Sequence, residues 1–231
     1  MRMRKRPNLQ PRMERSASVR IENPADLLGN WRSLKPDAKE LCLEIGCGKG
    51  KFTVETAKAN PDMLLIAVEK VQDCLILAME YALREQLTNV FFIACDAVDL
   101  PELFDRGEID RIYLNFSDPW PRKKNAKRRL TYHTFLERYA WVLSEQGRLE
   151  FKSDNVGLFD FSLEEFPAYG WQLSEVTRDL HANGPVGIMT GYEERFYAEG
   201  KPIQRFVAAP TVRPSEKPVR QDRFPVNPEE D

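Results

Sequence analysis

Short apolar runs alternate with helix-period segments along the chain from Leu41 onward. The apolar runs predict strands at 41–45, 64–68, 90–94, 110–115, 148–152, 171–176 and 203–208. The periodicity between several of them predicts helices at 50–59, 72–86, 131–143 and 157–166. Such alternation is typical of a parallel sheet that is covered on both faces. The pattern therefore predicts an α/β fold with a mainly parallel seven-stranded sheet and helices on both faces.

The length of 231 residues fits one domain with a tail at each end. We predict a basic N-terminal arm at 1–30, a domain at 31–209 and a proline-rich C-terminal tail at 210–231. Basic residues dominate the first twenty positions: Arg2, Arg4, Lys5, Arg6, Arg12, Arg15 and Arg20. Such an arm can contact RNA or remain a solvated terminus, and the sequence leaves both open. The formal net charge of −2 neither favours nor excludes a nucleic-acid partner.

The four cysteines, Cys42, Cys47, Cys74 and Cys95, lack the paired spacing of a zinc site. A disulfide framework is not expected in a chain of this length. The N-terminus has no apolar run typical of a signal peptide, and no window reaches the roughly eighteen apolar residues of a membrane span. We therefore expect a soluble, cytoplasmic protein with no metal site and no membrane partner.

The strand predicted at 41–45 runs directly into a glycine-rich turn. A P-loop is excluded, because only three residues separate Gly46 from Gly50, and Lys51 is followed by Phe52. The dinucleotide-binding fingerprint fits poorly, because it requires glycine at position 51. The remaining pattern, Glu-x-Gly-x-Gly-x-Gly between a strand and a helix, resembles the first motif of class I methyltransferases, which bind S-adenosylmethionine.

One acid stands at the end of each of the first three predicted strands: Glu44, Glu69 and Asp96. Because parallel strands end at one edge of a sheet, we expect these acids to line a single cleft with Gly46 and Gly48. Carboxylates suit S-adenosylmethionine, because its sulfonium and amino groups are cationic. We expect Glu69 to accept the ribose hydroxyls, and Asp96 to accept the adenine amino group beside the backbone of Ala97. Taken singly, each acid could instead cap a helix.

The segment 115–130 joins a stiff acidic and aromatic loop to a basic strip. Asp118 follows the strand predicted at 110–115, and Trp120 stands between two prolines that restrict the backbone. Six cationic side chains then occur within eight residues: Arg122, Lys123, Lys124, Lys127, Arg128 and Arg129. The arrangement indicates an enzyme that acts on a nucleobase and holds phosphates with the strip. A solvated charge run after a turn is the alternative.

With these motifs, the chain closely resembles the bacterial tRNA (guanine-N7-)-methyltransferase family from the glycine loop to Arg205. The resemblance rests on 43–50, 115–130, 151–155 and 190–193. It implies a Rossmann-like class I methyltransferase fold, S-adenosyl-L-methionine as cofactor and tRNA as partner, with the target guanine in the variable loop. We expect no obligatory protein partner, and either a monomer or a homodimer.

The same resemblance implies roles for individual residues. Glu44, Glu69, Asp96 and Asp118 are implied to line the cofactor pocket, and Asp118 is implied to be the catalytic acid. Substrate contacts are implied for the following residues: Arg122, Asp154, Thr190, Gly191, Tyr192 and Glu193. We expect the strip to bind RNA phosphates through Lys123, Lys124, Lys127, Arg128 and Arg129. The chain departs from the family pattern at Arg122, where lysine is usual, and at Asn125-Ala126, where histidines are common.

Guanine N7 carries a lone pair and no proton, so its methylation requires no general base. We expect Asp118 to accept hydrogen bonds from the N1–H and N2–H edge of the guanine and to stabilise the base as it becomes cationic. Trp120 is expected either to stack on a base or to lie in the core beneath the loop. Asp154 is expected at the same sheet edge, where the alternative is a cap for the following helix.

Two other functions stay open from the residues alone. Asn115 and Asp118-Pro119-Trp120 loosely resemble the Asp/Asn-Pro-Pro-aromatic loop of enzymes that methylate exocyclic amino groups, although Trp120 follows the first proline directly. The second is a non-catalytic RNA-binding module with the same fold.

Overall fold

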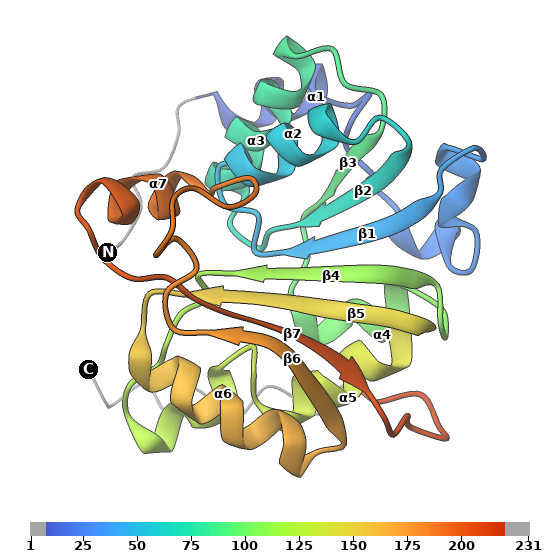
Figure 1. The fold of residues 1–231 in the computed structure, drawn as a ribbon. Coiled ribbons are helices and arrows are strands. Elements are labelled where there is room, and N and C mark those ends of the chain that lie inside the picture. The colour runs from blue at the N-terminus through green and yellow to red at the C-terminus, as the bar shows by residue number, and fades with distance from the viewer. Residues whose placement is uncertain (1–7, 220–231) are drawn as a thin grey trace, which may run out of the picture.

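A computed structural model describes residues 8–219 and shows a central sheet between two layers of helices (Figure 1). The strands are β1 (Glu40–Ile45), β2 (Met63–Val68), β3 (Val90–Ile93), β4 (Ile109–Asn115), β5 (Leu143–Ser153), β6 (Trp171–Thr177) and β7 (Gln204–Pro210). The α-helices are α1 (Leu9–Arg15), α2 (Lys51–Ala59), α3 (Gln72–Arg84), α4 (Leu100–Leu103), α5 (His133–Val142), α6 (Val156–Ala168) and α7 (Gly191–Ala198). Four 3-10 helices complete the described elements: η1 (Pro24–Leu27), η2 (Trp31–Leu34), η3 (Ala97–Asp99) and η4 (Lys123–Arg128).

The seven strands confirm the seven predicted from the sequence, and α2, α3, α5 and α6 confirm the four predicted helices. Within residues 8–219, the sequence did not predict α1, α4 or α7. Each of these three is short, with four to eight residues, so that little hydrophobic periodicity can accumulate along it.

The strands are arranged in the order β3-β2-β1-β4-β5-β7-β6. β1 pairs in parallel with both β2 and β4, whereas β7 is antiparallel to β5 and β6. The predicted α/β class and the mainly parallel sheet are therefore confirmed. The strand order reverses between β1 and β4, and in open α/β sheets ligands bind at the carboxyl ends of the strands beside such a switch point.

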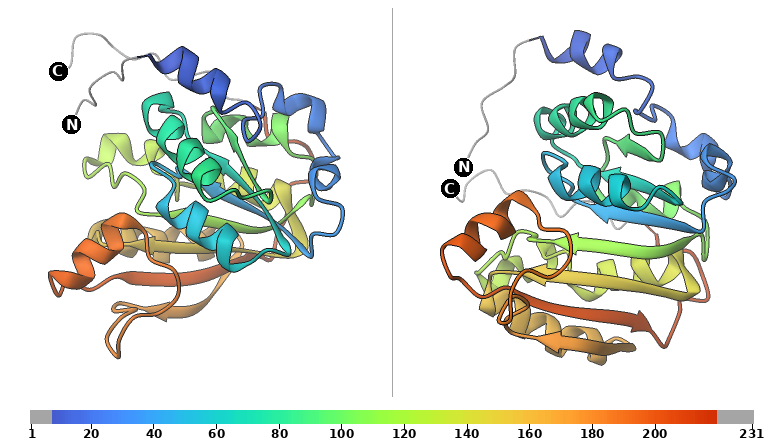
Figure 2. Two further views of the ribbon diagram at one scale, coloured as in Figure 1. Left: turned by 90° about the horizontal axis from the view of Figure 1, so that it is seen from above. Right: turned by 45° about the horizontal axis from the view of Figure 1, so that its top comes forward.

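Helices lie on both faces of the sheet (Figure 2). Alternation along the strands divides the apolar side chains between two cores on these opposite faces. Along β1, Leu41 and Leu43 belong to the core beneath α4, α5 and α6, whereas Cys42 belongs to the core beneath α2 and α3. Because side chains of a strand point to opposite faces in turn, a sheet with helices on both sides needs apolar residues at nearly every position. The all-buried sequence of β2 meets that requirement.

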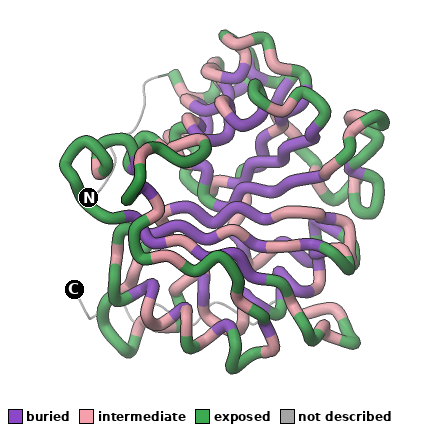
Figure 3. Tube along the Cα trace, in the orientation of Figure 1, coloured by how far each residue is buried: buried purple, intermediate pink, exposed green. Residues whose placement is uncertain are grey.

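Charged side chains replace apolar ones where α2 and α3 no longer cover the sheet. In Figure 1, β4, β5, β7 and β6 face the viewer below α2, and Figure 3 shows buried positions there interspersed with less buried ones. Ion pairs cross the sheet from β1 to β6 in the order Glu40, Arg111, Glu150, Arg205, Glu175. The uncovered face is therefore polar and internally paired.

The segment before β1 packs on the rest of the molecule. Met13 of α1 is buried against the α2 and α3 core. Phe92 donates its backbone N–H to Val19 O at 2.8 Å, and Ile21 donates to Phe92 O at 3.0 Å, so this segment covers the edge at β3. The division of the chain at residues 30 and 210 stays a prediction.

Both predicted tails extend past the described residues. Arg2, Arg4, Lys5 and Arg6 of the arm and residues 220–231 of the tail lie outside residues 8–219. Residues 211–219 contain no helix or strand. None of the described helices combines the length and the apolar character that crossing a membrane requires.

Trp31 packs the segment before β1 against the end of α4. Its side chain is 0% exposed, and its ring stacks on Phe104 with centroids 4.9 Å apart. The indole Nε1 donates to Leu103 O at 2.8 Å, and the backbone N–H donates to the Glu108 carboxylate at 3.0 Å. The buried indole therefore combines a large apolar contact with a satisfied polar atom.

We expect Trp31→Ala to lower the free energy of unfolding by about 3–5 kcal/mol, because it leaves a cavity and an unsatisfied carbonyl. Urea unfolding followed by circular dichroism measures this. Leu28→Ala is the control, because Leu28 is 43% exposed in the same segment, and we expect a loss within about 0.5 kcal/mol. Equal losses in the two variants would contradict the role of Trp31.

Candidate functional site

A cleft lies at the carboxyl ends of β1, β2, β3 and β4, beside the switch point. Its volume is about 330 Å³, within the range of small-molecule pockets. It brings together several of the predicted site residues: Gly46, Glu69, Asp96, Ala97, Asp118, Arg128 and Tyr192. Trp120 and Asn115 also line it. Residues from segments as distant as the glycine turn and α7 thus line one cavity.

Other predicted residues are placed around this cleft. Glu44 is buried beside it, and Gly48 donates its backbone N–H to Glu69 at 3.1 Å. The remaining predicted site residues, all within the described part of the chain, do not line the cleft: Arg122, Lys123, Lys124, Lys127, Arg129, Asp154, Thr190, Gly191 and Glu193. Their predicted contacts with substrate or RNA stay predictions.

The glycines of the turn after β1 have two different uses. Gly46 and Gly48 have positive φ angles of 80° and 57°, and a Cβ at either position would meet no protein atom within 4 Å. A ligand can therefore approach this backbone closely. A Cβ at Gly50, by contrast, would lie 2.4 Å from the Cβ of Ala78, so this glycine allows α2 to pack against α3.

Glu44 is a buried acid whose bonded partners are neutral. Its side chain accepts hydrogen bonds from Thr53 Oγ1 and, at 3.4 Å, from Asn115 Nδ2, and the residue is 2% exposed. Burial raises the pKa of the Glu44 carboxyl to about 7, although the two hydrogen bonds act in the opposite direction. A cation beside this carboxyl would favour its ionised form.

Glu69 and Asp96 each combine a local backbone contact with a place in the cleft. The Glu69 carboxylate accepts from the backbone N–H of Gly48 and, at 2.8 Å, of Val71 at the start of α3. Asp96 Oδ1 accepts from Val98 N at 3.3 Å and caps η3. The capping alternative therefore holds for Asp96, but each carboxylate keeps acceptor capacity for a ligand, because it has about four lone-pair sites.

The loop that carries Asp118 has an unusual backbone. Phe116 and Trp120 adopt positive φ angles of 53° and 40°, which non-glycine residues rarely do. Asp118 is exposed and lines the cleft. Trp120 is half-buried and also lines the cleft, so the alternative of a core tryptophan is wrong. Strained backbone of this kind is common at functional sites.

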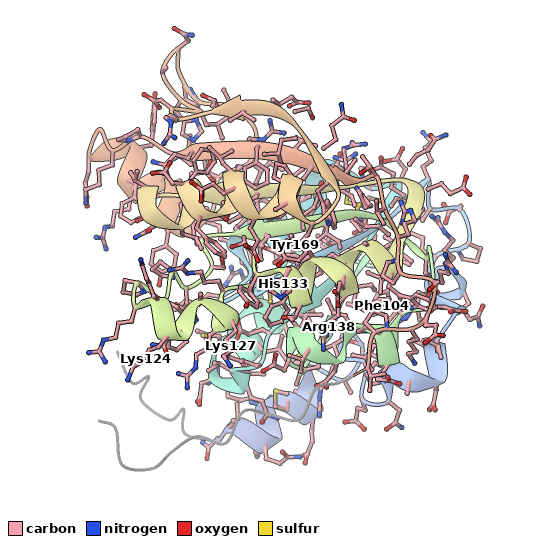
Figure 4. The ribbon with its side chains drawn as sticks, turned by 90° about the horizontal axis from the view of Figure 1, so that it is seen from below. Phe104, Lys124, Lys127, His133, Arg138 and Tyr169 are labelled. Carbon is pink, nitrogen blue, oxygen red and sulfur yellow. The ribbon has the colours of Figure 1, made fainter. Side chains whose placement is uncertain are left out.

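The basic strip forms η4 and a turn after it. Lys124 and Lys127 lie on the outer surface of this helix (Figure 4). Arg128 lies over the Trp120 ring, with its guanidinium carbon 4.9 Å from the centroid. Arg129 instead turns inward, where Nε donates to Pro119 O at 3.0 Å and Nη2 donates to Trp120 O at 3.1 Å. The strip is therefore not a uniform run of solvated charges.

Asp154 lies just past the end of β5 and is exposed. Asn155, not Asp154, caps the following helix, because its Oδ1 accepts from Leu158 N at 2.8 Å. The alternative assignment of Asp154 as the helix cap is therefore wrong. Its predicted contact with the substrate stays a prediction.

Residues 190–193 begin α7 with a capping box. Thr190 Oγ1 accepts from Glu193 N at 3.0 Å, and the Glu193 carboxylate accepts from Thr190 N at 3.2 Å. Tyr192 is 64% exposed and lines the cleft, whereas Glu193 is 0% exposed. Successive helical side chains point about 100° apart, so adjacent positions of α7 place Tyr192 at the cleft and Glu193 in the interior.

Two residues that the sequence analysis did not assign hold Glu193 in place. Lys152 Nζ donates to both carboxylate oxygens at 3.0 and 3.1 Å, and His181 Nε2 lies 2.9 Å from Oε1. Val186 donates its backbone N–H to His181 Nδ1 at 3.2 Å, so the geometry fits a neutral imidazole protonated on Nε2. The motif at 151–155 contains Lys152, but the sequence gives no sign of its long-range partner.

Comparisons with known proteins agree with this geometry. Among solved structures, a 16S rRNA methyltransferase KamB has a TM-score of 0.59 at 18% identity, covering 80% of this chain and 94% of that one. An antibiotic-related methyltransferase has a TM-score of 0.58 at 16% identity, with the same coverage of 80% and 94%. These likenesses show the fold alone, which is that of the class I methyltransferases.

Sequence comparisons are more specific. Residues 38–206 match the family model described as "Putative methyltransferase". The chain is 43% identical over 206 residues to a tRNA (guanine-N(7)-)-methyltransferase of Bacillus velezensis, covering 89% of this chain and 95% of the relative. It is 42% identical over 215 residues to the protein of that name in Bacillus cytotoxicus, covering 93% and 99%. The chain therefore belongs to the tRNA (guanine-N7-)-methyltransferase family.

Proposed function

We propose that this protein transfers a methyl group from S-adenosyl-L-methionine to N7 of a guanine in tRNA. The observation that carries the proposal is the single cleft that gathers the glycine turn, two strand-end acids and Asp118, in a chain 43% identical to a relative of that name. The variable loop as the location of the guanine follows from the family resemblance. A cytoplasmic location, no obligatory protein partner, and a monomer or homodimer are parts of the same proposal.

The charge of the cleft and the open space at its glycine turn support the choice of this cofactor. The cofactor, when bound, supplies an electrophilic methyl group on a cationic sulfur. Gly46 and Gly48 leave open space for it against their backbone, and Glu69 and Asp96 have acceptor capacity for ribose hydroxyls and an adenine amino group. Glu44 offers a carboxyl next to the glycine turn, where a positively charged amino group favours its ionised form.

Asp118 is proposed to orient the guanine. Its carboxylate can accept from the N1–H and N2–H edge, which fixes N7 relative to the methyl group. It also places negative charge near a base that becomes cationic as the new bond forms. Catalysis then depends on alignment and electrostatics, because N7 has no proton to remove.

A second candidate is methylation of an exocyclic amino group, favoured by the Asn115 and Asp118-Pro119-Trp120 residues that line the same cleft. That reaction must remove a proton from nitrogen, and so needs a base. Methylation of N7 needs none.

The direct test is methyl transfer from labelled S-adenosyl-L-methionine to an unmodified tRNA transcript, followed by digestion to nucleosides. We expect the label in 7-methylguanosine. A transcript with adenines in place of the variable-loop guanines is the control and should accept no label. A labelled base methylated on an exocyclic nitrogen would support the second candidate, and cofactor binding without any transfer would contradict both.

We expect Asp118→Asn to lower kcat by about a hundredfold or more and to change the cofactor Kd much less. The amide keeps the size of the side chain but loses the negative charge and one acceptor oxygen. Steady-state kinetics and calorimetric titration separate the two quantities. Asp160→Asn is the control, because Asp160 lies on α6 and pairs with Arg178. Near-normal turnover of Asp118→Asn would contradict the assignment.

Cofactor affinity is expected to rise with pH through the titration of Glu44. Its pKa of about 7 leaves the carboxyl neutral below that pH, so it attracts a cationic amino group weakly there. If binding lowers this pKa by about one unit, affinity rises roughly fivefold between about pH 6 and about pH 8. Isothermal titration calorimetry in buffers of different ionisation enthalpy measures the affinity and the released proton.

Glu44→Gln is the matched control for this titration. The variant cannot ionise at this position. Any pH dependence of affinity that comes from the amino group of the cofactor itself remains in the variant. The same pH dependence and proton release in the variant and the wild type would rule out Glu44 as the titrating group.

A further inference from the structure

The guanidinium of Arg129 forms hydrogen bonds with the loop that carries Asp118. Nε donates to Pro119 O at 3.0 Å, and Nη2 donates to Trp120 O at 3.1 Å. These are the two carbonyls that immediately follow Asp118. Arg129 is half-buried, unlike its exposed neighbour Arg128. The forked contact therefore joins the end of the basic strip to the part of the loop that follows Asp118.

The loop needs such a support at this place. Trp120 has a φ of 40°, in the left-handed region that is strained for a non-glycine residue. A conformation of this kind persists only when its surroundings fix it. Arg128 contacts the Trp120 ring. Arg129 binds the carbonyl of Pro119 before Trp120 and the carbonyl of Trp120 itself, which restrains rotation about the Trp120 N–Cα bond.

A second contact anchors the guanidinium to the body of the protein. Its central carbon lies over the Phe161 ring, 4.4 Å from the centroid. Phe161 belongs to α6 and packs against the larger core. The loop carbonyls are therefore connected through one side chain to a helix that does not itself line the cleft.

We propose that Arg129 is a positioning residue that holds the 118–120 turn and so aims Asp118 into the cleft, rather than a phosphate contact like the outer part of the strip. The inference rests on the proposed function for its kinetic consequence. Its geometric part, the bracing of the loop, stands without it. Arginine is required because its planar fork presents two donors in fixed directions, whereas a lysine ammonium is a single point charge.

The test compares Arg129→Lys, Arg129→Ala and the wild type. Arg129→Lys keeps the positive charge and removes the fork, so the two roles predict opposite results. We expect both variants to lower kcat by about tenfold or more at saturating tRNA, because a loop displaced by about 1 Å costs up to a hundredfold. We expect the slope of log tRNA affinity against log salt concentration to stay at the wild-type value in both variants.

Two further variants serve as references for the salt slope and for kcat. Lys123→Ala removes an exposed cation of the strip, and a phosphate contact there lowers the salt slope by about one. Arg84→Lys serves as the control for kcat, because Arg84 also lies over an aromatic ring, 4.6 Å from the Tyr81 centroid, at the end of α3. We expect its turnover to match the wild type.

Hydrogen exchange of the loop gives a readout that does not depend on methyl transfer. We expect faster exchange of the amide hydrogens of residues 116–118 and 120 in both Arg129 variants, with thermal unfolding and cofactor Kd close to the wild type. If this result is obtained but the wild type transfers no methyl group to tRNA, the proposed function is contradicted and the bracing role of Arg129 is still supported. Should either variant fail to fold, Phe161→Leu tests the same contact: it keeps Arg129 and is expected to loosen the same amides.

The proposal is overturned if Arg129→Lys restores wild-type kcat while Arg129→Ala lowers the salt slope by about one, because that pair of results identifies a phosphate contact. Unchanged hydrogen exchange in 116–120 in the folded variants would overturn it as well.

Discussion

The pairing of β1 with β4 is the constraint on which the rest of the site depends. Glu44 is in register with Tyr113, two residues before the end of β4, so the glycine turn and the Asp118 loop leave the sheet side by side. Asn115 crosses this junction by donating to Glu44 at 3.4 Å. This strand pair therefore brings the glycine turn and the Asp118 loop to one cleft.

Two buried acids near this junction have opposite electrostatic surroundings. Glu193 receives the ammonium of Lys152 and the imidazole of His181, so its charge is balanced inside the protein. The bonded partners of Glu44 are the neutral Thr53 and Asn115, and burial raises its pKa to about 7. An acid without a bonded cation inside the protein is suited to a cation from outside, because the incoming charge offsets part of the cost of ionising a buried group.

The sequence predicts the sheet and the acids at strand ends because both depend on local order. Apolar runs of a few residues mark the strands, and the acid after each run must lie at one edge once the strands are parallel. It does not predict the direction of a charged side chain. Arg128 and Arg129 are adjacent and chemically identical, yet one lies over Trp120 and the other binds loop carbonyls. Lys152 and His181 were missed for the same reason, because their shared partner Glu193 is 41 and 12 residues away.

The composition of the Asp118 loop explains why an arginine is placed after it. Pro119 and Pro121 have no N–H, so the turn has few donors with which to satisfy its own carbonyls. Buried or half-buried carbonyls need partners from elsewhere, and the left-handed Trp120 directs two of them toward one point. A single guanidinium supplies both donors from ten and nine residues further along the chain. The prolines leave the loop short of donors, and Arg129 supplies two of them, so these residues are parts of one arrangement.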